Sequence, residues 1–204
     1  MQPEIARHAA EAMLRALGPV VSADWSTRAG RLDWDCRTTV EHVGHALDRY
    51  SLYLAGPDTK RLPFQLVSHP ECTPADLIHI VELRAAVLCQ VARAAAPETR
   101  GYHTFGRSDR DGYVAMGCIE MLVHTDDVAR GMGLEFNPPA DLVRQVLTRL
   151  FPWAPTDTDP WQTLQWATGR VDLPGHPRVG ADWAWHASPV SEWDGVVKTQ
   201  ASYR

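Results

Sequence analysis

The chain has 204 residues, of which 45% are hydrophobic and 22% charged, the composition of a globular protein with room for one well-packed core. A formal net charge of −5 provides no basic surface for nucleic acid, and no apolar run reaches the length of a membrane span. The N-terminus lacks the pattern of a secretory signal, and the four cysteines include no Cys-x-x-Cys pair. We therefore expect a cytoplasmic protein without nucleic-acid or membrane partners.

Four segments have the apolar periodicity of long amphipathic helices: residues 4–18, Asp35 to about Ala55, Thr73 to about Ala96, and about Tyr113 to Arg130. Asp35 and Thr73 are favourable N-cap residues, and Gly56-Pro57 is a stop signal for the second segment. A shorter fifth helix is predicted to end before Pro152. Together these segments predict an all-α protein built on a four-helix bundle.

Residues 152–204 differ from the rest because they hold six of the eight Trp residues and many Pro residues. One or two helical turns are predicted over Trp161–Thr168, followed by a short hairpin or an extended strap. A segment of this composition and length cannot bury a core alone. We predict a bundle over residues 1–151 with an additional helix, and an aromatic-rich and Pro-rich tail over 152–204 that packs on the bundle and is not an independent domain.

Glu120 and His124 are four residues apart in the fourth predicted helix, so both side chains point to one face, one turn apart. The second helix offers His42 or His45 as a third polar group. Two imidazoles and a carboxylate from facing helices can bind a divalent metal and leave one coordination position open. Asp127 is placed to accept a hydrogen bond from the far ring nitrogen of His124. The alternative is a surface Glu–His pair and a buried histidine, with no metal.

Two motifs resemble those of a known family. Trp34–His42 (Trp-Asp-Cys-Arg-Thr-Thr-Val-Glu-His) is similar to the first metal-ligand motif of the DinB-like superfamily, in the branch of the mycothiol-dependent maleylpyruvate isomerase N-terminal domain. Glu120–Gly131 resembles the second motif of that branch, and Trp166–Arg170 is similar to C-terminal segments of actinobacterial members. The resemblance implies a DinB-like bundle with a divalent metal, most commonly zinc, bound by His42, Glu120 and His124.

The same resemblance implies an enzyme whose metal activates mycothiol, a small thiol, for sulfur transfer to an electrophilic small molecule or for isomerisation of that molecule. A free thiol, with a pKa of about 8.5, is mostly protonated at neutral pH, and coordination to a metal deprotonates it. The short tail favours transfer over maleylpyruvate isomerisation itself. Two alternatives stay open: a hydrolase or Lewis-acid enzyme without a thiol, and a bundle that binds a metal or ligand without turnover. The expected partners are a small-molecule substrate and a thiol, and the protein is expected to be a monomer or homodimer.

Five further side chains are candidates for substrate binding: His45, Arg49, His103, Arg107 and Arg170. The first two share a helix face with the predicted ligand from the second helix. The next two lie in the polar loop before the fourth helix, where solvated charges are the alternative interpretation. The last follows a glycine in the tail, and its guanidinium could bind a carboxylate with two hydrogen bonds.

Overall fold

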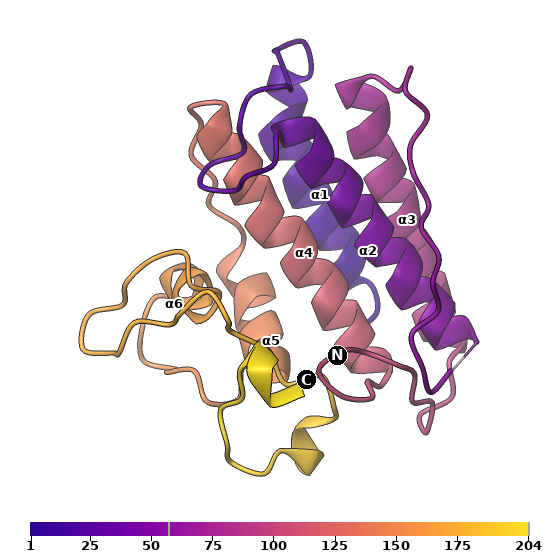
Figure 1. The fold of residues 1–204 in the computed structure, drawn as a ribbon, viewed down its shortest axis with the longest axis vertical. Coiled ribbons are helices and arrows are strands. Elements are labelled where there is room, and N and C mark those ends of the chain that lie inside the picture. The colour runs from indigo at the N-terminus through magenta and orange to yellow at the C-terminus, as the bar shows by residue number, and fades with distance from the viewer. Residues whose placement is uncertain (57, 204) are drawn as a thin grey trace.

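Six α-helices form the regular structure of the computed structural model, which describes residues 1–56 and 58–203 (Figure 1). Pro57, half of the predicted stop signal after the second helix, therefore lies outside the described residues. No strand occurs in the described ranges, where only isolated β-bridges are present, so the all-α prediction is confirmed. The helices are α1 (Ile5–Leu17), α2 (Cys36–Ala55), α3 (Pro74–Ala94), α4 (Arg110–Gly131), α5 (Ala140–Leu150) and α6 (Pro160–Ala167).

Helices α1 to α4 form the four-helix bundle (Figure 1). Both α1 and α2 pack closely against α3 and α4, while α1 and α2 make few contacts with each other and lie across the bundle. Helix α5 packs on the outside of α4, and α6 packs on α5. No helix among the described residues is both long enough and apolar enough to cross a membrane.

Helix α4 is buried along nearly its whole length, from Gly112 to Ala129, because the bundle covers one side and α5 and the tail cover the other. Its buried polar residues therefore need partners inside the protein. The helix starts at Arg110, one turn before the predicted start, because the Asp109 side chain accepts a hydrogen bond from the Gly112 N–H at 2.8 Å and caps it. The predicted start at Tyr113 was wrong by that turn.

Helix α2 begins after the predicted N-cap. The Asp35 carboxylate accepts a hydrogen bond from the Thr38 N–H at 2.7 Å. We expect Asp35→Ala to lower the free energy of unfolding by about 1 kcal/mol, because the first turn of α2 loses its cap, whereas Asp35→Asn retains an accepting oxygen and should cost a few tenths. Urea denaturation of the two variants measures the difference. Equal losses from both variants would contradict a capping role.

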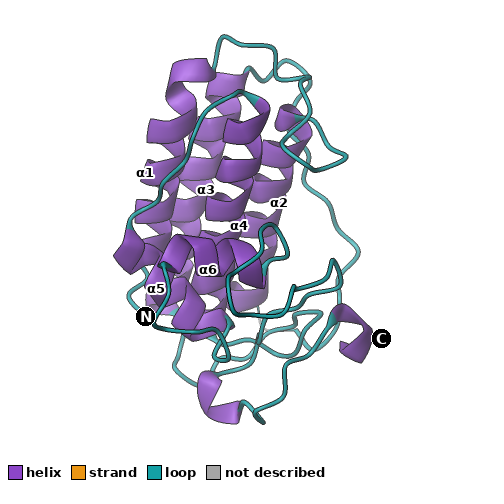
Figure 2. Cartoon of the chain, turned by 90° about the vertical axis from the view of Figure 1, so that its left-hand side faces the viewer, coloured by secondary structure: helices purple, strands orange, loops and turns teal. Residues whose placement is uncertain are grey.

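The tail after α5 is an extended strap with short helical turns, and Figure 2 shows it gathered as loops beside the lower part of the bundle. Of the two predicted forms, the strap is present and the hairpin is not: Trp183 and Thr199 form a single isolated bridge. Tail side chains join the core, among them Leu164, Trp166 and Trp185.

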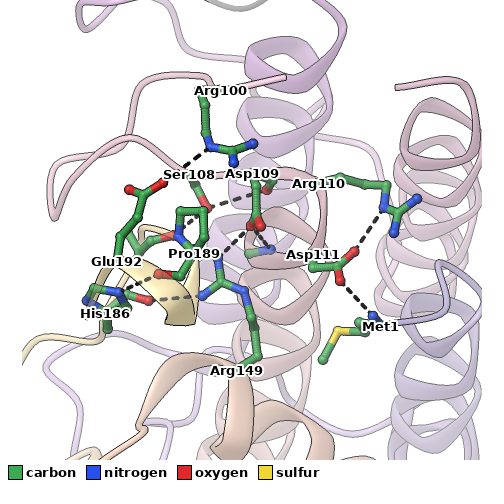
Figure 3. A network of polar contacts seen from close by, with 12 residues as sticks. Met1, Arg100, Ser108, Asp109, Arg110, Asp111, Arg149, His186, Pro189 and Glu192 are labelled. Atoms are coloured by element: carbon green, nitrogen blue, oxygen red, sulfur yellow. Dashed lines mark hydrogen bonds and ion pairs between the residues drawn. The ribbon is translucent and has the colours of Figure 1, made fainter. Parts of the chain in front are cut away.

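A polar network holds the strap to the start of α4 (Figure 3). Arg149 of α5 donates to the Asp109 carboxylate at 2.6 Å and to the carbonyl oxygens of His186 and Ala187 at 3.2 and 3.0 Å. The Ser108 hydroxyl donates to the same Ala187 carbonyl at 2.7 Å. These contacts join α5, the strap and the loop that precedes α4 into one unit.

Candidate metal centre

Three side chains from two helices converge on one point of the bundle. The Oε2 atom of Glu120, on α4, lies 3.4 Å from the Nε2 of His124 on the same helix and 3.4 Å from the Nε2 of His42 on α2. All three atoms lie within 4.8 Å of one another. The geometry therefore brings together the three predicted metal ligands.

Two of the three spacings match those around a divalent metal ion. A tetrahedral zinc with bonds of about 2.0–2.2 Å needs neighbouring ligand atoms about 3.4 Å apart, which is the distance from Glu120 Oε2 to each imidazole nitrogen. The widest separation within the cluster reaches 4.8 Å, so the two imidazoles would have to move closer together around an ion. Two neutral imidazoles and one carboxylate also match the donor preferences of zinc and leave a net positive charge on the ion. The side chains of Glu120 and His124 are only 11% and 10% exposed, while that of His42 is 38% exposed, so the cluster is closed on the α4 side and open on the side of His42.

Tyr50 fixes the orientation of the Glu120 carboxylate. Its hydroxyl donates to Oε1 at 2.9 Å and leaves Oε2 to face the two imidazoles. Burial, and then the charge of Glu120, raise the pKa of Tyr50 well above its usual value, so the phenol stays protonated as a donor. Burial alone would raise the pKa of Glu120, but hydrogen bonds with His124 and His42 outweigh it and lower that pKa well below its usual value.

His124 is oriented by Asp127. The Nδ1 of His124 lies 2.9 Å from Oδ2 of Asp127, which leaves Nε2 for the centre of the cluster. Burial would lower the pKa of His124, but its hydrogen bonds with Asp127 and Glu120 outweigh that effect and raise it. Carboxylate–imidazole pairs of this kind orient the metal-binding histidines of many proteins.

Arg170 of the strap binds the other side of Asp127. Its Nη2 donates to Oδ2 at 2.7 Å and its Nε donates to Oδ1 at 3.3 Å. The predicted bidentate grip on a carboxylate is thus present, but the carboxylate belongs to the protein. Arg170 was predicted to bind substrate, and its pairing within the fold gives that prediction no support.

His45 is satisfied by other groups. Its Nε2 accepts a hydrogen bond from Arg49 Nε at 2.9 Å, and its Nδ1 contacts the Leu66 backbone, 3.0 Å from the carbonyl oxygen and 3.3 Å from the amide nitrogen. With both ring nitrogens in use, His45 has no atom free for a metal. Of the two histidines that α2 offers, the geometry selects His42.

A pocket of about 360 Å³ opens beside the cluster. Its walls come from α2, the loop after α2, the loop before α4, and Trp34, whose ring centroid lies 4.8 Å from that of His42. Three of the predicted substrate-binding residues line it: His45, Arg49 and His103. Arg107 does not, because its guanidinium turns away and donates to the Arg100 carbonyl at 2.7 Å. The predicted role of Arg107 is therefore not supported by its position.

The sequence prediction missed Tyr50 and Arg61, which also line the pocket. Tyr50 lies eight residues after His42, two helical turns along the same face of α2, so its spacing could have suggested it. Arg61 lies in an irregular loop, where no periodicity in the sequence indicates which way a side chain points.

The sequence model of one family, described as the mycothiol maleylpyruvate isomerase N-terminal domain, matches residues 6–129. The chain belongs to this family. The match covers more than half of the chain, includes His42, Glu120 and His124, and confirms the resemblance seen in the sequence motifs. It ends before α5, so the strap and Arg170 lie beyond the family match. Searches of curated proteins and of solved structures found no match.

Proposed function

We propose that this protein is a metal-dependent enzyme that binds a small thiol, in the first instance mycothiol, and adds its sulfur to an electrophilic small molecule. The observation that carries the proposal is the cluster of His42, Glu120 and His124 at the wall of an open pocket. The pocket volume of about 360 Å³ is within the range typical of small-molecule sites. Membership of a family named for a mycothiol enzyme supports the choice of thiol.

A divalent ion held by these three side chains would supply a Lewis acid that lowers the pKa of a coordinated thiol from about 8.5, so that the nucleophile exists at neutral pH. The protein's own residues do the rest. Tyr50 and Asp127 hold Glu120 and His124 in place, so no reorientation is needed when ligands bind. Trp34 packs beside His42, with its ring centroid 4.8 Å from that of the imidazole, and restricts the positions that this ring can take on the open side of the cluster.

The charges of the pocket favour an anionic electrophile. Arg49 and Arg61 both line it, and Glu120 is the one carboxylate among its described lining residues. Since that carboxylate faces the metal ligands, the two guanidinium groups are not neutralised by an acid inside the pocket. A small substrate with a carboxylate group complements this arrangement.

Cobalt in place of zinc provides the test. We expect the metal-free protein to take up about one equivalent of Co²⁺, and millimolar mycothiol to add a sulfur-to-cobalt charge-transfer band in the near ultraviolet. The disulfide form of mycothiol, which has no thiol to coordinate, is the matched control and should leave the spectrum unchanged. A cobalt spectrum that does not respond to mycothiol would contradict the thiol proposal, and failure to bind cobalt would contradict the metal site itself.

A further inference from the structure

His103 lies in the loop between α3 and α4 and lines the same pocket as His42 and Glu120, yet it is not part of the metal cluster. Its Nδ1 accepts a hydrogen bond from the backbone N–H of Phe105 at 3.0 Å. An imidazole nitrogen that accepts a hydrogen bond carries no proton, so in the neutral ring the proton sits on Nε2. The backbone of the loop thereby selects one tautomer of His103.

The Nε2–H of His103 is a donor without an acceptor among the described residues. No hydrogen bond to this atom is present, and it is not among the polar side-chain atoms sealed inside the protein without a partner. Because His103 belongs to the pocket wall, we infer that this atom faces the pocket. A donor of this kind is available to a ligand.

The ring of His103 is fixed by aromatic neighbours on several sides. Its centroid lies 5.2 Å from that of Phe105, 5.4 Å from that of Trp185 in the strap, and 6.3 Å from that of Tyr50 on α2. Loss of hydration on burial among these rings lowers the pKa of His103 to about 4, against the opposing effect of the Glu120 charge. The imidazole is therefore neutral at physiological pH.

The loop that carries His103 is itself held in place. Gly101 and Ser108 exchange two backbone hydrogen bonds of 3.0 Å across its base, and the Tyr113 hydroxyl donates to the Tyr102 carbonyl at 2.7 Å. Gly106 adopts a φ of +110°, which favours glycine and allows the tight return of the chain. The contact of Ser108 with the strap adds a further restraint (Figure 3). The donor is thus positioned before any ligand binds.

From this geometry we propose that His103 is a catalytic hydrogen-bond donor, whose neutral Nε2–H binds the carbonyl oxygen of an unsaturated carbonyl substrate. The proposal rests on the function proposed above. For an electrophile in which negative charge develops on oxygen, it assigns the group that stabilises this charge.

The chemical step balances without an oxidant or reductant. The thiolate sulfur forms a bond to the β-carbon of the substrate, and the π bond between the α- and β-carbons breaks. Its electron pair forms a double bond between the α-carbon and the carbonyl carbon, and the carbonyl π pair moves to the oxygen, which gives an enolate. The Nε2–H hydrogen bond strengthens as this oxygen becomes negative, and the proton stays on His103. The enolate then either expels the thiolate and restores the double bond, or takes a proton from water at the α-carbon.

Two electrophiles with mycothiol test the proposal: methyl vinyl ketone, whose oxygen becomes negative, and iodoethane, whose displacement places no charge on a carbonyl. We expect His103→Phe, which retains an aromatic ring against Trp185 and Phe105, to lower kcat with the ketone about a hundredfold and to leave the iodoethane rate unchanged. His103→Gln retains an N–H donor and should keep the ketone rate within about tenfold of wild type. Glu98→Gln, in the exposed start of the same loop and outside the pocket, should leave both rates unchanged.

A separate reading comes from NMR of protein labelled with ¹⁵N in histidine, with the His103 signals assigned by their loss in His103→Gln. We expect a neutral ring with the proton on Nε2 at pH 7. A proton on Nδ1, or a charged ring at pH 7, overturns the proposal whatever the activity.

The kinetic outcomes separate this role from the proposed function. If wild-type protein accelerates thiol addition to neither electrophile, the proposed function fails and takes the role of His103 with it. If wild type accelerates the ketone reaction and His103→Phe does so equally well, the role of His103 alone fails. An equal loss with both electrophiles would show that His103 supports the fold of the pocket and overturns its assignment as an oxygen-binding donor.

Discussion

Replacing His42 with alanine is expected to weaken zinc binding by more than about a hundredfold. Loss of an outer hydrogen-bond partner of a metal ligand typically costs about 10–100-fold, and loss of a ligand itself should exceed this. His42 is the single ligand contributed by α2, so Glu120 and His124 alone would hold the ion from one side. Because the His42 side chain is 38% exposed, its removal leaves no large cavity in the core, and the fold should survive.

The matched control is His45→Ala, three residues along the same helix. His45 lines the same pocket, but its ring nitrogens are bonded to Arg49 and Leu66. Competition with a chromophoric chelator measures the zinc affinity of each variant, and circular dichroism checks that the helices are intact. Equal weakening by the two substitutions would contradict the assignment of His42 as the ligand, and weakening by His45→Ala alone would reverse it.

His42 and His45 also show which part of the site the sequence alone could not predict. Helical spacing places Glu120 and His124 together because one turn of α4 is a local feature. The same rule leaves His42 and His45 equivalent, since both lie on one face of α2. Their difference depends on the loop after α2, whose Leu66 backbone occupies His45, and a contact between residues 21 positions apart has no signature in periodicity.

The helices, like the Glu120–His124 pair, could be predicted where the interactions that define them are short in range. Asp35 and Thr73 start their helices as capping residues because the interaction spans only three positions. The start of α4 was misplaced because Asp109 sits in a polar loop where several residues could cap, and its carboxylate is also bound by Arg149, 40 residues later. The sequence also could not show that the Arg170 guanidinium points toward Asp127, because this contact depends on how the strap lies against α4.

The ion pair between Asp127 and Arg170 leads to the second large expected effect. We expect Asp127→Ala to lower the free energy of unfolding by about 3–5 kcal/mol, because the substitution leaves a guanidinium in the interior without its counter-charge. The two side chains are 7% and 18% exposed, so water cannot readily replace the lost carboxylate. The same substitution also removes the hydrogen-bond partner of His124 Nδ1, which should weaken zinc binding by about 10–100-fold.

Asp172→Ala is the matched control, since it breaks another aspartate–arginine pair of the tail. Asp172 and Arg178 are separated by a similar distance, 3.0 Å, but their side chains are 71% and 65% exposed. Exposed pairs contribute at most about 1 kcal/mol, so this variant should unfold close to wild type. Urea denaturation in the presence of a chelator compares the variants without any contribution from bound metal. If both substitutions lower the free energy of unfolding equally, burial does not make the Asp127–Arg170 pair stronger than the exposed pair. If Asp127→Ala lowers the free energy of unfolding but binds zinc as tightly as wild type, Asp127 fastens the strap to α4 without orienting His124.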